Sequence, residues 1–168
     1  MCRFINSIIA VTAAGAVTGF VGIRATGVSV TRPVEGVWRT AEVRMGGASP
    51  RTITQIQPNL AIITGKHYSR VEIHAEGTRP NVADASKATA DELRQMWGPV
   101  VAEAGRYELS GSTLTLRPAV SKNPAAMAPG AFVAYSYRVA GDSLWLTYER
   151  TERGPVPNPP TIKLTRVE

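Results

Sequence analysis

Two matching stretches, each centred on a glycine, place the strongest constraint on how this chain folds. Residues 107–116 (YELSGSTLTL) and 137–146 (YRVAGDSLWL) both carry Tyr four residues before the glycine and Leu three and five residues after it. A glycine between two alternating runs, free to adopt positive φ, is typical of a tight antiparallel hairpin. Two hairpins of one pattern predict a meander of antiparallel strands.

The remaining chain contains further short runs of strand-forming residues separated by turn signals. Strands are predicted over 37–45, 52–57, 60–64, 66–74, 131–139, 143–150 and 161–167. With the pair around Gly111 this makes eight to nine strands, and the absence of βαβ alternation from the sequence makes their sheet antiparallel. The predicted fold class is all-β, an antiparallel up-and-down barrel with one inserted helix and an N-terminal apolar leader.

One helix interrupts the strands. Thr89 and Glu92 have the spacing of a capping box, in which each side chain accepts from the other's backbone N–H. An apolar stripe follows and ends before Gly105, with Gly98-Pro99 predicting a kink inside it. The stripe is either part of the core or a lid over one mouth of the barrel, and it consists of Leu93, Met96, Trp97, Val100, Val101 and Ala104.

The first residues are predicted to be a targeting segment and not part of the barrel. Arg3 precedes an uncharged run over 4–23, and Arg24 ends it. This pattern indicates a signal peptide over 1–25 or, because the cleavage signal is poor, a signal anchor that spans a membrane with residues 4–23. A linker over 26–33 and a domain over 34–168 would follow. The domain is therefore expected to be exported, to the periplasm or to the medium.

Charge and cysteine content exclude several classes of function. Cys2 is the only cysteine, so the domain has no disulfide and no thiol chemistry. The formal net charge is +6, but the basic residues are scattered singly, which does not suit a nucleic-acid partner. His67 and His74 fall on opposite faces of one strand, and no metal site is expected from them. The sequence holds no phosphate-binding glycine loop and no nucleophile elbow, and no cofactor is predicted.

Gly36-Val37-Trp38 stands at the head of the first predicted strand. The glycine lets the backbone pass close to a neighbour, and the tryptophan can plug one end of a small barrel. Together with the meander and with Arg166 near the end of the last strand, this motif resembles the lipocalin-like (calycin-type) barrels, in particular bacterial lipocalin-like domains. The resemblance covers roughly residues 34–168.

The resemblance implies a barrel with an internal cavity for a small apolar or amphipathic molecule, and a floor made by Gly36, Trp38 and Arg166. In lipocalins a late arginine packs over the tryptophan, and Arg166 matches it. The chain departs from the family pattern because its helix lies between the middle strands and no disulfide ties the C-terminus. Some relatives of this fold catalyse isomerisations or cyclisations.

The strand over 66–74 supplies the most polar candidates. Val71 and Ile73 mark one face as inward, which places His67 and Ser69 in the cavity. Tyr68, Arg70 and Glu72 then face outward. With the opposite phase, these three become the cavity residues instead.

Other ligand-binding candidates come from the aromatic and basic residues of the later strands and of the helix. Tyr and Trp offer apolar area with one polar atom at the tip, which suits an amphipathic ligand. On the strand over 37–45 both faces are equally apolar, so the direction of Glu42 and Arg44 is ambiguous. With His67, Ser69 and Val71, the predicted ligand-binding residues are Trp97, Tyr107, Arg117, Tyr135, Tyr137 and Trp145.

Three functions are compatible with these patterns. The favoured one is an exported protein that binds a small apolar or amphipathic molecule. The second is a non-hydrolytic isomerase or cyclase on the same barrel, with His67 as acid or base and Tyr68 or Tyr137 as a donor. The third is an interaction module tethered to a membrane only by its N-terminal segment. The oligomeric state is not specified by the sequence.

Overall fold

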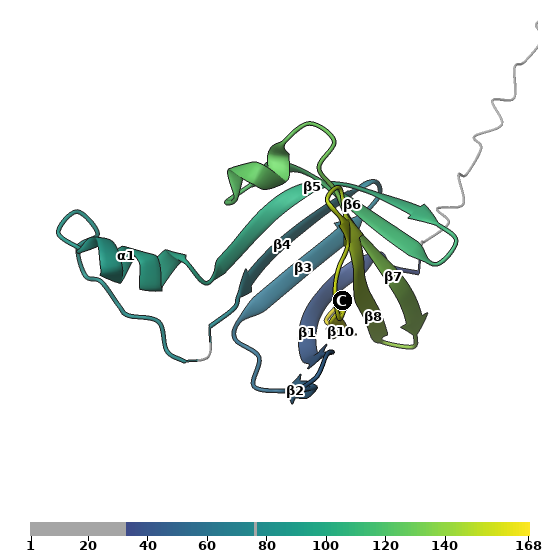
Figure 1. The fold of residues 1–168 in the computed structure, drawn as a ribbon, viewed down its shortest axis with the longest axis horizontal. Helices are drawn as coiled ribbons and strands as arrows, with labels where there is room; N and C mark the ends of the chain where they lie inside the picture. Colours follow the sequence, from purple (N-terminus) through teal and green to yellow (C-terminus); the bar gives the residue numbers. More distant parts are fainter. Residues whose placement is uncertain (1–32, 76) are drawn as a thin grey trace, which may run out of the picture. The chain divides into compact units, whose positions relative to one another are not determined.

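The computed structural model describes residues 33–75 and 77–168, which form a single closed β-barrel (Figure 1). The predicted leader over 1–25 lies outside the described residues, and so does the predicted linker over 26–33 apart from Pro33. In the part of the chain that is described, no helix has the length and apolar character needed to cross a membrane.

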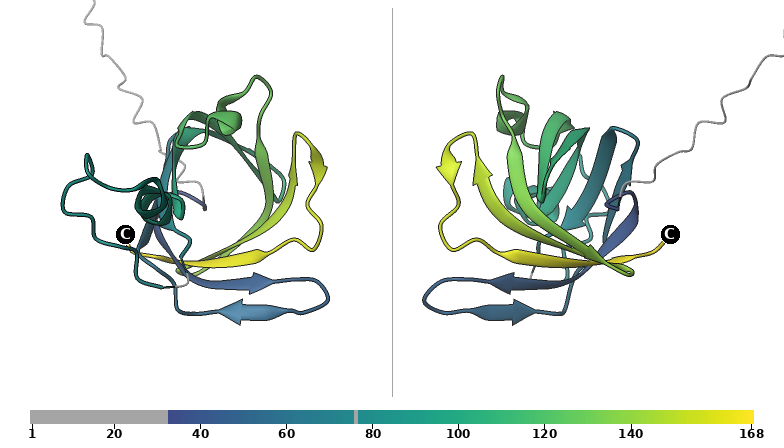
Figure 2. Two further views of the ribbon diagram at one scale, coloured as in Figure 1. Left: turned by 60° about the vertical axis from the view of Figure 1, so that its left-hand side comes forward. Right: turned by 90° about the vertical axis from the view of Figure 1, so that its right-hand side faces the viewer.

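Eight antiparallel strands make the wall in the order β1-β3-β4-β5-β6-β7-β8-β10, and β10 closes it by pairing with both β8 and β1 (Figure 2). Two short strands, β2 (Arg51–Ile53) and β9 (Gly154–Pro155), pair with β1 and β8. The predicted all-β, up-and-down barrel is confirmed. Its wall strands are β1 (Gly36–Met45), β3 (Asn59–Thr64), β4 (His67–Ile73), β5 (Val100–Ser110), β6 (Thr113–Ser121), β7 (Val133–Ala140), β8 (Ser143–Thr151) and β10 (Thr161–Arg166).

Three tight turns lie at one end of the barrel, which we call the closed end. Gly65, Gly111 and Gly141 adopt φ values of 58°, 55° and 54°, a conformation that costs glycine little. They join β3 to β4, β5 to β6 and β7 to β8. Both hairpins of the repeated pattern therefore form as predicted. The longer connections lie at the other end, the open end.

Trp38 fills the closed end and is fully buried. Its indole Nε1 donates to the carbonyl of Val34 at 2.8 Å. The guanidinium carbon of Arg166 lies 4.1 Å from the indole ring centroid. That guanidinium also donates to the carbonyl oxygens of Glu35 at 2.6 Å and Pro33 at 3.3 Å. The Arg166 guanidinium therefore covers one face of Trp38 and holds the segment before β1 by hydrogen bonds to Glu35 and Pro33.

Gly36 allows this close packing. Its φ is 143°, and a Cβ at this position would lie 2.1 Å from Nη1 of Arg166. A side chain at position 36 would displace Arg166 from the Trp38 ring. Glycine is therefore needed at position 36 for this arginine to pack on the tryptophan. The rest of the buried core continues from this plug along the barrel axis and includes Ile63, Tyr68, Tyr107, Leu114, Leu116, Tyr135, Leu144, Leu146 and Leu164.

Bulges interrupt three strands in the half nearer the open end. The extra residues are Ala41 in β1, Ala119 in β6 and Glu149 in β8, as the shifts in strand register show. A bulge bends its strand and reverses the side-chain alternation beyond it. On β1, Trp38 faces inward before Ala41, and Val43 pairs with the inward-facing partner after it. This reversal explains why both faces of the predicted strand are apolar.

The helix is shorter than predicted. α1 spans Ala90–Trp97, and its capping box forms as expected, with Thr89 and Glu92 each accepting from the other's backbone N–H. The prediction of helix beyond Gly98 is wrong, because Pro99 has no N–H and blocks a further turn. The apolar residues that follow belong to β5.

α1 contributes neither core nor lid. Each of its residues is at least partly exposed, with Trp97 55% exposed, and the helix extends away from the strands (Figure 1). Its C-terminal end is held by Lys122, whose Nζ donates to the carbonyls of Trp97, Gly98 and Val100. A short 3₁₀ helix, η1 (Pro124–Met127), joins β6 to β7.

Candidate functional site

A cavity of about 710 Å³ lies at the open end of the barrel. It opens to solvent and is bordered by the first residues of β5 and β7, the last residues of β6 and β8, and the segments that follow them. Part of its lining is apolar, including Val101, Ala102, Pro118, Ala131, Val133 and Val156, while Arg70, Glu103 and Tyr148 supply polar atoms. This volume is within the range of sites for small organic molecules.

Arg70 and Glu103 belong to a cluster inside the barrel, which we call the Arg70 cluster: Tyr68, Arg70, Glu72, Glu103 and Tyr135. Glu103 Oε1 accepts from the Tyr68 hydroxyl and from Arg70 Nε, both at 3.0 Å. Arg70 Nη1 donates to the Tyr135 hydroxyl at 3.4 Å. Three strands thus contribute to one hydrogen-bonded network around a single guanidinium.

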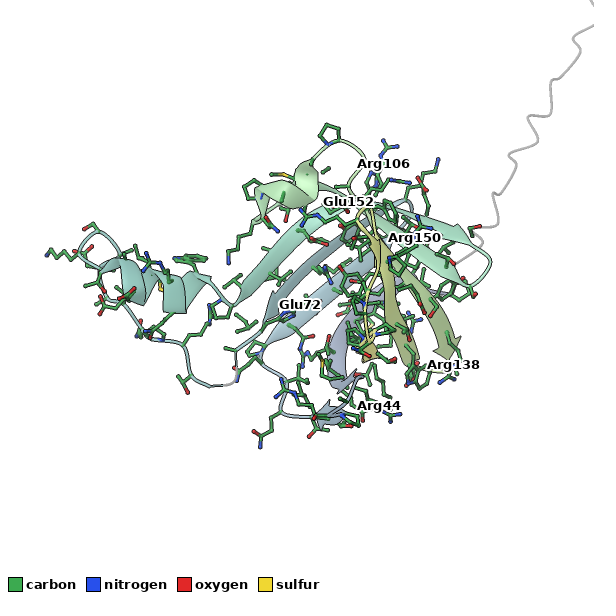
Figure 3. All side chains as sticks on the ribbon, in the orientation of Figure 1. Arg44, Glu72, Arg106, Arg138, Arg150 and Glu152 are labelled. Atoms are coloured by element: carbon green, nitrogen blue, oxygen red, sulfur yellow. The ribbon has the colours of Figure 1, made fainter. Side chains whose placement is uncertain are left out.

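Glu72 extends this cluster toward solvent (labelled in Figure 3). Its Oε1 lies 3.7 Å from Arg70 Nη1, and its Oε2 lies 2.8 Å from Nε2 of His74. Burial alone would raise the pKa of Glu72, but the His74 hydrogen bond and the Arg70 charge hold the pKa below its usual value. Glu72 is therefore ionised at neutral pH.

The environment fixes the protonation states of the other members. Burial, reinforced by the Glu103 carboxylate, raises the pKa of Tyr68. Burial likewise raises the pKa of Tyr135 and of Tyr148, whose rings stack with centroids 5.4 Å apart. Burial opposes the Arg70 charge, but Tyr135, Glu72 and Glu103 outweigh it and raise the pKa. The cluster therefore presents neutral hydroxyls around a permanent cation.

Local backbone features bring β5 and β6 into position beside the cluster. A Cβ on Gly105 would lie 2.0 Å from the carbonyl oxygen of Arg117, so the two strands approach closely only because position 105 is glycine. The Ala119 bulge follows at once. Beyond it, Glu103 pairs with Ser121, and both residues line the cavity.

The predicted inward direction of His67, Ser69 and Val71 is wrong. Tyr68 is 4% exposed and Val71 is 51% exposed, so β4 has the opposite phase. The outer surface of the barrel around β4 is itself apolar, since Leu60 on β3 pairs with Val71 and both are exposed. An apolar residue on this strand therefore does not mark the inside.

The remaining predicted ligand residues are spread over the molecule. Tyr135 is in the Arg70 cluster, whereas the Tyr107 hydroxyl donates to Gly65 O and to Glu35 Oε1 at the closed end. Tyr137 packs against the core. Three others lie outside the cavity: Trp97 on α1, Trp145 between Arg138 and Lys163, and Arg117 beside Glu108 and over Phe132.

The structure does not bring together the acid–base pair that an isomerase or cyclase would need. His67 is exposed on the outer face of β4, and Tyr68 is buried on the inner face. Of the residues that do converge, Arg70 and Glu72 fall on the face predicted to point outward, Glu103 lies in the predicted helix region, and Tyr148 is not among the predicted site residues. The signal that could have found Glu103 is Pro99, which limits the helix and makes residue 103 part of a strand.

A scan against protein-family models gives no match to this chain, and a search of curated proteins gives none either.

Proposed function

We propose that this protein binds a small amphipathic molecule in the open end of its barrel, in the manner of lipocalin-like carriers. The observation that carries the proposal is the cavity of about 710 Å³, whose lining joins apolar residues to the polar atoms of Arg70 and Glu103. The stacking of Arg166 on Trp38 behind Gly36 supports the lipocalin-like resemblance. The expected export of the protein rests only on the leader predicted over residues 1–25.

The proposal is tested by filling the cavity. Val101 lines it, whereas Val71 is exposed on the outer wall. Val101→Trp is expected to weaken binding of the uncharged fluorescent probe N-phenyl-1-naphthylamine by about tenfold or more, because a large side chain excludes the probe from its space. Val71→Trp, the same substitution outside, is the matched control and should leave binding unchanged.

Two results would contradict the proposal. One is no saturable binding of the probe to the native protein, and the other is equal binding by Val101→Trp and the native protein. Native mass spectrometry of protein purified from its own host provides an independent check, since a retained small molecule adds its mass to the chain.

A further inference from the structure

We propose that the polar end of the ligand is an organic cation, such as a primary ammonium group, bound by Glu103. This inference rests on the proposed function and names the chemical class of ligand that the same cavity accepts. It is carried by a buried carboxylate that lines the cavity with one oxygen still available.

Glu103 is almost entirely buried, with 7% of its side chain exposed. Both of its hydrogen bonds, from Tyr68 and Arg70, end on Oε1. Oε2 has no partner among residues 33–75 and 77–168, and in the same residues every fully buried side-chain oxygen has one. Oε2 is therefore not fully buried, and the space beside Glu103 is the cavity that it lines. A carboxylate oxygen is an acceptor only, so it requires a donor from the ligand.

The charges around Arg70 favour a cation over an anion. The guanidinium lies between Glu72 and Glu103, so the Arg70 cluster contains one more carboxyl group than it has cations. Glu72 Oε2 is already paired with His74 on the side toward solvent. Charge interactions are strong in the low-dielectric interior of a barrel. A ligand ammonium group would neutralise this excess, and a carboxylate would increase it.

The cations that line the cavity are already engaged. Arg70 donates from Nε to Glu103 and from Nη1 to Tyr135. Lys122 donates to three backbone carbonyls near the end of α1. Arg153 lies 3.4 Å from the carboxylate of its neighbour Glu152. A cation at Glu103 Oε2 would displace none of these partners.

An aromatic side chain lines the same cavity as Glu103. Tyr148 lines the cavity together with Glu103, and its ring stacks on Tyr135. The electron-rich face of a tyrosine attracts organic cations in addition to its apolar contact. A carboxylate and an aromatic ring that line one cavity form the chemistry that recognises an alkylammonium group.

The test compares three ligands with one alkyl chain and different heads: dodecylammonium, dodecanoate and dodecanol. Each displaces N-phenyl-1-naphthylamine from the full-length protein at neutral pH. Dodecylammonium is expected to bind at least about tenfold more tightly than dodecanoate, the scale of one charge-assisted hydrogen bond. Glu103→Gln should remove this preference and leave dodecanol binding unchanged. Glu108→Gln, on the outer face of the same strand, should retain it.

Three results distinguish a failure of this inference from a failure of the proposed ligand-binding function. Equal or tighter binding of dodecanoate by the native protein overturns the inference, and so does an unchanged preference in Glu103→Gln. No binding of any of the three ligands, or of the probe, overturns the proposed function itself. If Glu103→Gln does not fold by circular dichroism, Tyr148→Leu replaces it. That variant should weaken dodecylammonium more than dodecanol, and equal losses would overturn the inference.

Discussion

The closed and open ends of the barrel are filled by side chains of different kinds. At the closed end Val34, Trp38, Leu114 and Leu144 are all fully buried, and tight turns join the strands. Toward the open end the interior holds a guanidinium, two carboxylates and tyrosine hydroxyls, and three strands are bulged. The same ring of strands thus contains a dry plug at one end and a hydrogen-bonded cluster beside a cavity at the other.

This difference separates stability from function. A buried ion cluster contributes little net stability compared with apolar side chains of the same size. Polar residues inside a barrel that could have been filled with leucine therefore call for a reason other than folding. The closed end, in contrast, is explained by packing alone. The two ends should respond differently to substitution.

The largest effect is expected from removing the plug. Trp38→Ala should lower the free energy of unfolding by about 3–5 kcal/mol, the range for deleting a buried large aromatic side chain. Denaturant unfolding followed by circular dichroism measures this change. Probe binding at the open end should persist in the folded fraction. Trp97→Ala, at an exposed tryptophan, is the control and should change stability by less than about 0.5 kcal/mol; similar losses in both variants would break the comparison.

The next effect concerns the cluster. Arg70→Met should destabilise the protein by about 3 kcal/mol, because it leaves Glu72 and Glu103 inside the barrel without their cation. The triple change Arg70→Met, Glu72→Gln, Glu103→Gln should recover part of this loss in the same unfolding assay. No recovery would show that Arg70 acts by its packing and not by its charge.

A pH effect should follow from Glu72. Its pKa is lower in the folded protein than in the unfolded chain, so the stability it contributes is present above the usual glutamate pKa and is lost as the pH falls through the folded value. Urea unfolding should show a loss of about 1.5–3 kcal/mol on acidification, the scale of a hydrogen bond to a charged group. Glu72→Gln should reduce the pH dependence below about pH 4.5; the native slope in this variant would contradict the assignment.

The smallest effects test the phase of β4. Tyr68→Phe removes a buried hydroxyl and should cost about 1 kcal/mol. His67→Gln, one residue earlier on the outer wall, should change stability by less than about 0.5 kcal/mol and leave probe affinity unaltered. If His67→Gln were the more damaging change, the inward face of β4 would have to be reassigned.

Alternation and turn chemistry predict most of the strands, and the barrel is predicted from the meander together with the Gly36-Val37-Trp38 motif. The two glycine-centred repeats became the β5–β6 and β7–β8 hairpins because their local sequence determines both the turn and the alternation. The capping box at Thr89 likewise marked the start of α1. Its end was missed because Val100, Val101 and Ala104 fit a helical stripe as well as a strand, and Pro99 decided between them.

The cavity residues were harder to predict, because whether a side chain points into or out of the barrel depends on how its strand pairs with its neighbours. Val71 has the pattern of a core residue, but it lies beside Leu60 on an apolar outer surface. On β1 the Ala41 bulge reverses the alternation within one strand, so a single phase fits neither half. Glu103 meets Arg70 only through the β4–β5 register, which no local pattern in either segment contains.

The seam between β1 and β10 has a consequence for the order of folding. It pairs Trp38 with Arg166, the start of the barrel with its last strand, and contacts so distant in sequence form late because a long loop must close first. Until β10 is in place, β1 and β8 each expose an unpaired edge, the feature that most readily recruits strands from other chains. Pairing of β10 covers both edges and so removes the surface most open to aggregation. Arg166, which packs on Trp38, is part of that strand.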